Sequence, residues 1–233
     1  MASPKIRLIE MPDAFMGVDA LRHFAWDKQY ANKMLSCWVK QGVLDRLGPR
    51  LDVYAQCGRV PALQRVDAML NAMPTGHYQV DANVFRQYGW STQIAHRREE
   101  AIPSLSRMCD PRKDLRLHGR SRRWWSFVAP GLLAEDEKTG MPAHLHPAWL
   151  LAESFFHPKS LWWSPDLDDL DVDTMEMDNE GPAFAHALVR LAQYYKVPLQ
   201  LEKGFTVEQL YVSAKSLMQK TFAANDEIRV DYV

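Results

Sequence analysis

The chain has 233 residues, of which 47% are hydrophobic and 24% are charged, with a net charge of −1. It holds no apolar run of about 18 residues, which excludes a membrane-spanning helix, and its three cysteines (Cys37, Cys57 and Cys109) lie too far apart for a zinc ribbon or a disulfide framework. Met1–Glu10 is short and mixed in charge, unlike a signal peptide, so we expect a cytoplasmic protein.

The near-zero net charge hides a strong asymmetry along the chain. Residues 1–126 hold 20 Lys and Arg against 12 Asp and Glu, a net charge of +8, whereas residues 127–233 hold 8 against 17, a net charge of −9. A basic half is typical of nucleic-acid-binding proteins. The acidic half is suited either to a protein partner or to keeping the molecule soluble.

The first elements of the chain are short. Ser3–Met11 is compatible with a strand or one helical turn, and Pro12 and Asp13 then break the chain. Ala14–Phe24 predicts a helix with four apolar residues on one face, namely Phe15, Val18, Leu21 and Phe24. Ala25-Trp26-Asp27 predicts a turn, in which Asp27 is suited to cap the next helix.

Residues 26–54 are the most informative stretch. Within them, Ala31, Met34, Leu35 and Trp38 recur at i, i+3, i+4 and i+7, which predicts one buried face of a helix over 27–41. Gly42 is placed to end this helix. Val43–Leu47 and Leu51–Tyr54 then predict two strands around Gly48-Pro49-Arg50.

This order of helix, tight turn, helix and hairpin is typical of a winged helix-turn-helix. We therefore predict an α+β protein, with a winged-helix DNA-binding domain at residues 1–60 and a mixed α/β domain of antitoxin or regulatory role at residues 61–233. The usual first helix of such a domain has hardly any room before Phe15.

The polar residues of this stretch form a predicted DNA-binding site. A solvent-exposed helix with no further role would look the same in isolation, but the glycine stop, the basic hairpin and the basic half of the chain favour DNA. Long cationic and amide side chains reach phosphates and base edges. The predicted DNA-binding residues are Lys28, Gln29, Tyr30, Asn32, Lys33, Ser36, Lys40, Arg46 and Arg50.

The remaining elements alternate between strand and helix. The predicted helices are Ala62–Met73 (with Leu63, Val66, Met69 and Leu70 as its apolar stripe), Asp81–Tyr88, Pro147–Phe156, Ala183–Tyr195 and Val207–Phe222, the last begun by a Thr206/Gln209 capping box. The predicted strands are Tyr78–Val80, Leu115–Leu117 and Arg122–Val128. Trp162–Asp173 predicts an acidic loop, and Ala223–Val233 a polar tail or terminal strand.

A second basic series lies in the middle of the chain. It comprises Arg97, Arg98, Arg112, Lys113, Arg120, Arg122 and Arg123. Two interpretations stay open for it, a wider DNA footprint or docking on the acidic half of the same molecule. Trp124 and Trp125 beside the last two arginines are also typical of single-strand binders.

The sequence indicates neither a metal site nor a catalytic site. His144, His146 and His157 have no cysteine nearby, and the acidic run 166–173 lacks the glycine and final glutamate of a calcium loop. No GxSxG, Walker A or HExxH motif occurs. We therefore expect no enzymatic activity, no cofactor and no bound metal; a nucleic-acid enzyme would require a site that these patterns do not reveal.

Several local patterns in order resemble the AbiEi-like antitoxins of type IV toxin–antitoxin systems. Phe15–Tyr54 is similar to their winged helix, and VFRQYGWSTQI at 84–94 to a helix followed by a G-[LW]-[ST]-T-Q-[VI] turn. Arg122–Trp125 and His146–Phe156 are similar to later elements, so the resemblance covers about residues 15–175.

The resemblance implies a transcriptional regulator that represses its own promoter. Its partners would be double-stranded DNA that carries promoter repeats and a nucleotidyltransferase toxin, with which the antitoxin need not make direct contact. The resemblance is compatible with a homodimer, and we expect no membrane partner. Two alternatives fit the same residues: a stand-alone regulator of a mobile element, and a protein–protein adaptor that does not bind DNA.

Overall fold

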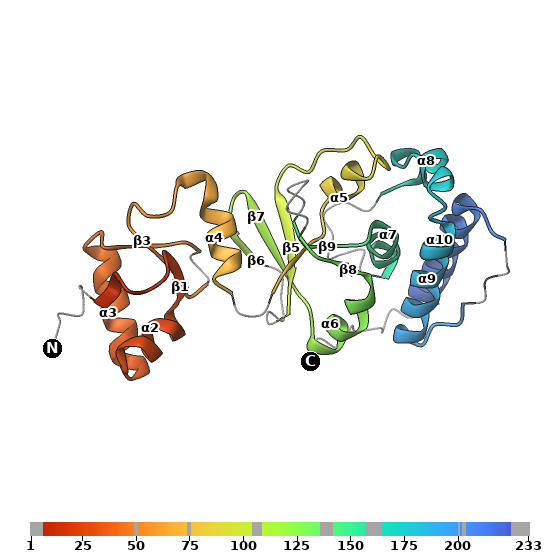
Figure 1. Ribbon diagram of the computed structural model, residues 1–233. Coiled ribbons are helices and arrows are strands. Elements are labelled where there is room, and N and C mark those ends of the chain that lie inside the picture. Colours follow the sequence, from red (N-terminus) through yellow and green to blue (C-terminus); the bar gives the residue numbers. More distant parts are fainter. Residues whose placement is uncertain are drawn as a thin grey trace. The chain divides into compact units, whose positions relative to one another are not determined.

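The protein is a mixed α/β chain that divides into two compact units, shown in a computed structural model (Figure 1). The first unit comprises residues 1–76 and 109–116, and the second comprises residues 77–108 and 117–233. The structure describes residues 7–48, 51–73, 76–103, 109–135, 142–156, 165–199, 201 and 204–224.

In the residues that the structure describes, the first unit contains a sheet of short strands together with helices. In chain order these are β1 (Ala14–Met16), α2 (Gly17–Phe24), α3 (Lys28–Lys40), β2 (Leu44–Arg46), β3 (Val53–Gln56), the 3-10 turn η1 (Ala62–Gln64) and α4 (Arg65–Asn71). The strands form an antiparallel sheet in the order β1-β3-β2. This unit extends past the predicted boundary at residue 60, since α4 buries Met69 and Leu70 and Met69 lies beside Gly48.

The start of the chain differs from the sequence prediction. Ala14–Met16 is a strand, not the first turn of a helix, because it pairs with Val53–Ala55 of β3 across the sheet. The helix begins only at Gly17, and Val18, predicted to be buried, is 38% exposed. Ahead of the strand, Arg7 and Leu8 are helical, and Leu8 is buried in the core of the first unit. There is thus helical structure where the sequence left little room for it.

A left-handed residue joins α2 to α3. Ala25 has φ 55° and ψ 41° and is exposed, and its N–H bonds to the carbonyls at the end of α2. An L-residue with a Cβ pays roughly 1–2 kcal/mol for this conformation, and glycine does not.

Replacing Ala25 with glycine should therefore stabilise the protein. We expect Ala25→Gly to raise the free energy of unfolding by up to about 1 kcal/mol, because the relief of strain exceeds the added chain entropy. Ala72→Gly is a matched control, because Ala72 ends α4 in a right-handed conformation, which alanine adopts without strain. This variant should therefore be less stable than the wild type. Urea unfolding of both variants measures the difference, and a less stable Ala25→Gly variant would contradict the prediction.

The rest of the chain builds a larger sheet covered by helices. The elements are β4 (Tyr78–Gln79), α5 (Ala82–Gln87), β5 (Arg98–Ile102), β6 (Cys109–Arg112), β7 (Leu115–Gly119), α6 (Arg122–Val128), η2 (Ala129–Gly131), β8 (Leu132–Leu133), β9 (His144–Leu145), α7 (Pro147–Phe156), η3 (Leu167–Asp169), α8 (Val172–Met177), α9 (Gly181–Tyr195) and α10 (Val207–Ala224). The sheet order is β6-β7-β5-β4-β9-β8, in which β4 and β9 are parallel. In the second unit, α7 packs against α9, and α10 packs against both (Figure 1).

Three sequence predictions are wrong: two concern the second unit, and the third concerns the segment before α4. Arg122–Val128 is a helix, not a strand: Ser121 caps it by accepting the N–H of Trp124, and Trp124 and Val128 are buried four residues apart. The predicted acidic loop contains η3 and α8, where Asp171 caps α8 and Met175 is buried. Leu63, placed on a buried stripe, is 95% exposed because the α-helix starts at Arg65.

Several other elements are confirmed. Helices α3, α5, α7 and α9 lie where the sequence predicts them, and strand β4 and the beginning of β7 do as well. Thr206 and Gln209 form the predicted reciprocal cap of α10, each accepting the other's backbone N–H. The tail beyond Ala224 lies outside the described residues.

Candidate nucleic-acid interface

Helix α3 is held by a hydrophobic face that matches the predicted one. Ala31, Leu35 and Trp38 are buried, and Met34 is half-buried. At the start of the helix, the Asp27 carboxylate accepts the N–H of Tyr30 at 2.9 Å. This local anchoring orients the opposite face of α3 to solvent.

The solvent face of α3 is cationic and rich in hydrogen-bond donors. The exposed residues are Lys28, Gln29, Tyr30, Asn32, Lys33, Ser36 and Lys40, all of them predicted site residues. No Asp or Glu occurs between residues 28 and 41, so no carboxylate of the helix itself neutralises the three lysines. A solvated helix usually mixes both signs of charge, whereas the charged side chains of α3 itself are all lysines; the Asp27 carboxylate at its start caps the helix.

The adjoining hairpin adds one described arginine. Arg46 at the end of β2 is exposed, and its Nε donates to the carbonyl of Leu51 at 3.3 Å. Its guanidinium lies 6.0 Å from the ring centre of Tyr54, so the side chain is oriented while keeping further N–H donors. Arg50, the other predicted hairpin residue, lies outside the described residues.

The second basic series is mostly neutralised by carboxylates. Arg97 pairs with Glu99, Arg98 with Glu100, and Arg112 with Asp114. Arg120 is only 7% exposed and bonds to Glu153 through Nε and Nη2 at 3.0 and 2.7 Å. Arg120 therefore does not belong to a basic surface, contrary to the sequence prediction. Three members are exposed, namely Lys113, Arg122 and Arg123.

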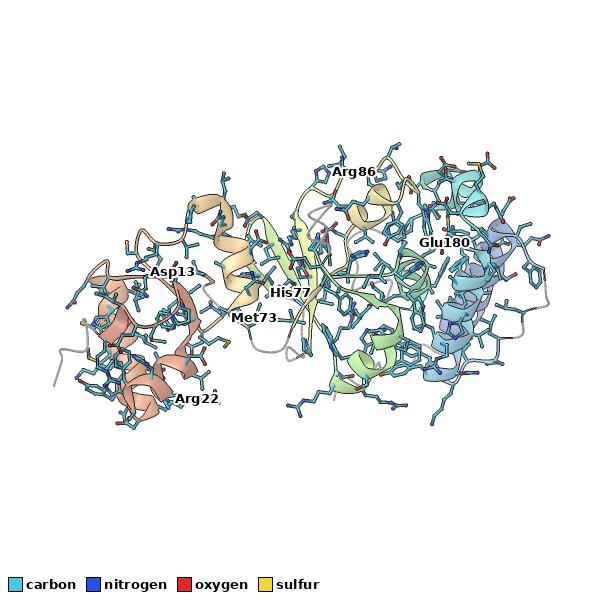
Figure 2. The ribbon with its side chains drawn as sticks, viewed as in Figure 1. Asp13, Arg22, Met73, His77, Arg86 and Glu180 are labelled. Carbon is cyan, nitrogen blue, oxygen red and sulfur yellow. The ribbon has the colours of Figure 1, made fainter. Side chains whose placement is uncertain are left out.

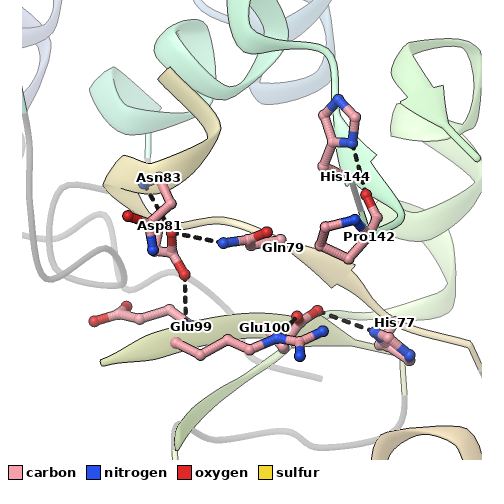
Figure 3. Close-up of polar contacts among 9 residues, drawn as sticks. His77, Gln79, Asp81, Asn83, Glu99, Glu100, Pro142 and His144 are labelled. Carbon is pink, nitrogen blue, oxygen red and sulfur yellow. Dashed lines mark hydrogen bonds and ion pairs between the residues drawn. The ribbon is translucent and has the colours of Figure 1, made fainter. Parts of the chain in front are cut away.

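Sequence reasoning missed a buried polar network in the second unit (Figure 3). Glu100 is fully buried and accepts hydrogen bonds from Arg98 and His77 at 2.6 and 3.1 Å. Asp81, the cap of α5, accepts from Gln79, from Asn83 and from the backbone of Glu99. Burial raises the pKa of Asp81, and these hydrogen bonds offset part of the shift. The signal in the sequence is the unusual pair Glu99-Glu100 within a strand.

His118 is the most constrained histidine of this network. Its Nε2 lies 2.6 Å from a carboxylate oxygen of Glu99, whereas its Nδ1 is buried and has no hydrogen-bond partner among the described residues. Burial, together with the charge of Arg120, lowers the pKa of His118, because protonation of Nδ1 would create an unsatisfied buried donor.

Stability should consequently fall in mild acid. At pH values above about 6.5, the pKa of His118 in the unfolded chain, His118 is neutral in both the folded and the unfolded state. Between that pH and the lower pKa of the folded state, only the unfolded chain is protonated at His118, so the free energy of unfolding falls as the pH falls. We expect the melting temperature of the His118→Gln variant to fall less than that of the wild type between about pH 7.5 and pH 5.5. Exposed His186→Gln should keep the wild-type pH dependence; equal losses in all three proteins would contradict the assignment.

His144, one of the histidines that resemble metal ligands in the sequence, contacts other groups of the protein. In His144, Nδ1 donates to the carbonyl of Pro142 at 2.8 Å and Nε2 lies 3.0 Å from the hydroxyl of Tyr88 (Figure 3 shows the first contact). Within the described ranges, no group of three or more His, Cys, Asp or Glu is placed to hold a metal ion. His157 lies outside them.

In comparisons with known proteins, no family model matches the chain, and no curated protein matches it. Among the described helices, none has the length and apolar character required to cross a bilayer. The exposed face of α3 is thus the feature on which a functional argument can be built.

Proposed function

We propose that this protein is a DNA-binding transcriptional regulator that contacts double-stranded DNA through α3. The observation that carries the proposal is the solvent face of α3, which bears three lysines and several amide and hydroxyl groups and no carboxylate. Phosphate binding requires this kind of cationic, donor-rich surface.

The elements around α3 support a winged helix-turn-helix as its setting. Helix α2 ends at Phe24, and its capping residue Ala25 lies two residues before Asp27, the cap of α3, which is the short turn of a helix-turn-helix. Strands β2 and β3 follow as an antiparallel pair. In this interpretation α3 is the recognition helix, and the hairpin between β2 and β3 is the wing.

The side chains divide into two roles. Lys28, Lys33 and Lys40 neutralise phosphates, with Arg46 and Arg50 doing so from the hairpin. Gln29, Tyr30 and Asn32 lie in the first two turns of α3, the end of a recognition helix that usually meets base edges. Amide side chains form paired hydrogen bonds with adenine.

The biological role follows from the family resemblance of the sequence. We propose that the protein represses its own promoter as an antitoxin and that its second unit counters a nucleotidyltransferase toxin. The buried ion pairs of that unit support its fold. The proposed antitoxin role does not depend on a particular toxin-binding surface.

Binding of the protein to its own promoter tests the proposal directly. We expect the logarithm of the affinity to fall with the logarithm of salt concentration with a slope of about −4 to −5, since five cationic side chains are assigned to phosphates. Fluorescence anisotropy with labelled promoter and scrambled duplexes measures this slope. Absence of binding at about 50 mM salt, with a stoichiometric protein partner in pull-downs, would favour an adaptor instead.

Asn32→Ala should mainly relax specificity. Loss of a paired amide contact costs roughly 1–3 kcal/mol on the promoter and little on scrambled DNA. Ser36→Ala is the control on the same face, because its short hydroxyl carries a weaker preference among bases. Equal weakening of both duplexes by Asn32→Ala would assign Asn32 to the DNA backbone rather than to the bases.

A further inference from the structure

The C-terminal half of α9 forms a basic surface together with α6. The ring of Tyr194 lies 5.3 Å from Trp124 and 4.7 Å from Phe127, which fixes α6 against α9. The guanidinium of Arg123 lies 4.9 Å from the ring centre of Tyr194, and that of Arg190 lies 5.4 Å from Phe127. Stacking of this kind orients arginine while leaving its N–H groups available.

These arginines differ from Arg97, Arg98 and Arg120 of the second unit, which are paired with glutamates. Arg98 and Arg120 each bind a buried glutamate, whereas within the described part of the chain no ion pair joins Arg122, Arg123 or Arg190 to a carboxylate. Neither α6 nor α9 contains an Asp or Glu. We call Arg122, Arg123 and Arg190 the basic patch.

The opposite end of α9 is acidic. Residues 165–180 hold eight Asp and Glu and no Lys or Arg, and this segment leads directly into α9 at Glu180, which is labelled in Figure 2. Asp168, Asp173 and Asp178 are exposed, and we call them the acidic patch. Met177 is 78% exposed among them.

The helix dipole of α9 accounts for only part of this arrangement. It favours acid at the start of α9 and base at its end. It does not favour Arg122 and Arg123, which occupy the N-terminal turn of α6, where positive charge is unfavourable. Nor does it explain why a large apolar side chain, Met177, is left in solvent.

We propose that a second copy of this chain docks on these patches. The two α9 helices lie antiparallel, so that the basic patch of each copy meets the acidic patch of the other. A two-fold axis then forms both charge contacts at once and closes the dimer. Arginine is suited to bidentate contacts with Asp, and Met177 meets the half-buried aromatic rings beside the basic patch.

The length of α9 sets the spacing of the two contacts. Its 15 residues span roughly 22 Å at about 1.5 Å per residue; the acidic patch precedes its first residue, and the basic patch lies beside its last two turns, where Arg190 belongs to α9 and Arg123 stacks on Tyr194. The two charge contacts therefore lie on either side of the symmetry axis, and a single-contact complex would be an open chain of copies. The proposed dimer does not depend on the proposed DNA binding, and the experiment that tests it contains no DNA.

Sedimentation velocity of the full chain measures the association. We expect dimers at tens of micromolar protein in low salt and monomers at about 0.5 M salt, because the contacts are largely electrostatic. Arg122→Glu/Arg123→Glu, and separately Asp173→Lys/Asp178→Lys, should each raise the dimer dissociation constant at least about tenfold. Arg86→Glu, an exposed change on α5 (Figure 2), is the control and should leave it unchanged.

The most stringent test mixes the two doubly reversed variants and measures whether they associate with each other. In a mixed dimer one contact has both charges exchanged and the other is native, so an equimolar mixture should regain dimers that neither variant forms alone. Monomeric wild type at low salt, dimers unaffected by either reversal, or no rescue on mixing would each overturn the proposal. Weaker DNA binding by Arg122→Glu/Arg123→Glu without a change in association would do the same and would assign the basic patch to phosphates, leaving the role of α3 untouched.

Discussion

Reversal of Lys28, Lys33 and Arg50 to glutamate should remove promoter binding at physiological salt. Each lost phosphate contact reduces the salt slope by about one, so the slope should fall by about three and the affinity on the order of 100-fold or more. The loss should be equal on promoter and scrambled DNA, because phosphates carry no base sequence. Anisotropy titrations at several salt concentrations measure both quantities.

A matched variant separates this local effect from net charge. Arg86→Glu/Lys196→Glu/Lys215→Glu changes the charge by the same amount in the second unit and should keep most of the affinity. Circular dichroism of both variants checks that α3 is still folded. Intact promoter binding after the reversal in the first unit would show that α3 is not the DNA-binding surface.

Replacement of Glu153 with leucine should destabilise the protein more than any of the substitutions on the solvent face of α3. Glu153 is fully buried on α7, and its Oε1 accepts both hydrogen bonds from buried Arg120. Its removal takes away the carboxylate that accepts these two hydrogen bonds of the buried guanidinium, which costs about 3–5 kcal/mol. Thermal unfolding should show a fall in melting temperature on the order of 10 °C.

The double variant Arg120→Met/Glu153→Leu should recover much of this loss. Replacement of a whole buried ion pair by apolar residues of similar size is often neutral or stabilising, because no charge remains to be desolvated. Within the described ranges, the other Glu153 oxygen is buried and has no hydrogen-bond partner, so the hydrogen bonds to Arg120 satisfy only one of its two oxygens. A double variant as unstable as Glu153→Leu would show that Arg120 makes further essential contacts.

Sequence patterns predicted elements whose stability depends on near neighbours. The α3 helix follows from apolar residues three and four apart and from the Asp27 cap three residues before Tyr30. The cap of α10 likewise joins Thr206 to Gln209. The solvent face of α3 could be predicted for the same reason, since the residues left off the apolar stripe are those that meet water.

Patterns failed where distant residues outweigh local preference. Ala14–Met16 is a strand because Val53–Ala55, about forty residues later, supplies its hydrogen bonds. Arg122–Val128 has β-favouring aromatic residues, but Trp124 is buried and donates its Nε1–H to the hydroxyl of Tyr78, 46 residues away along the chain. This long-range packing favours the helix, which Ser121 caps.

The sequence by itself determined the helix that presents the candidate DNA-binding side chains and the overall separation of charge. Only the tertiary structure decided which arginines are available to a partner. Arg120 meets Glu153 across 33 residues, whereas Arg123 meets the ring of Tyr194 and no carboxylate among the described residues. Chain distance hides such pairings, because burial of a charge depends on which side chains folding brings within hydrogen-bonding reach.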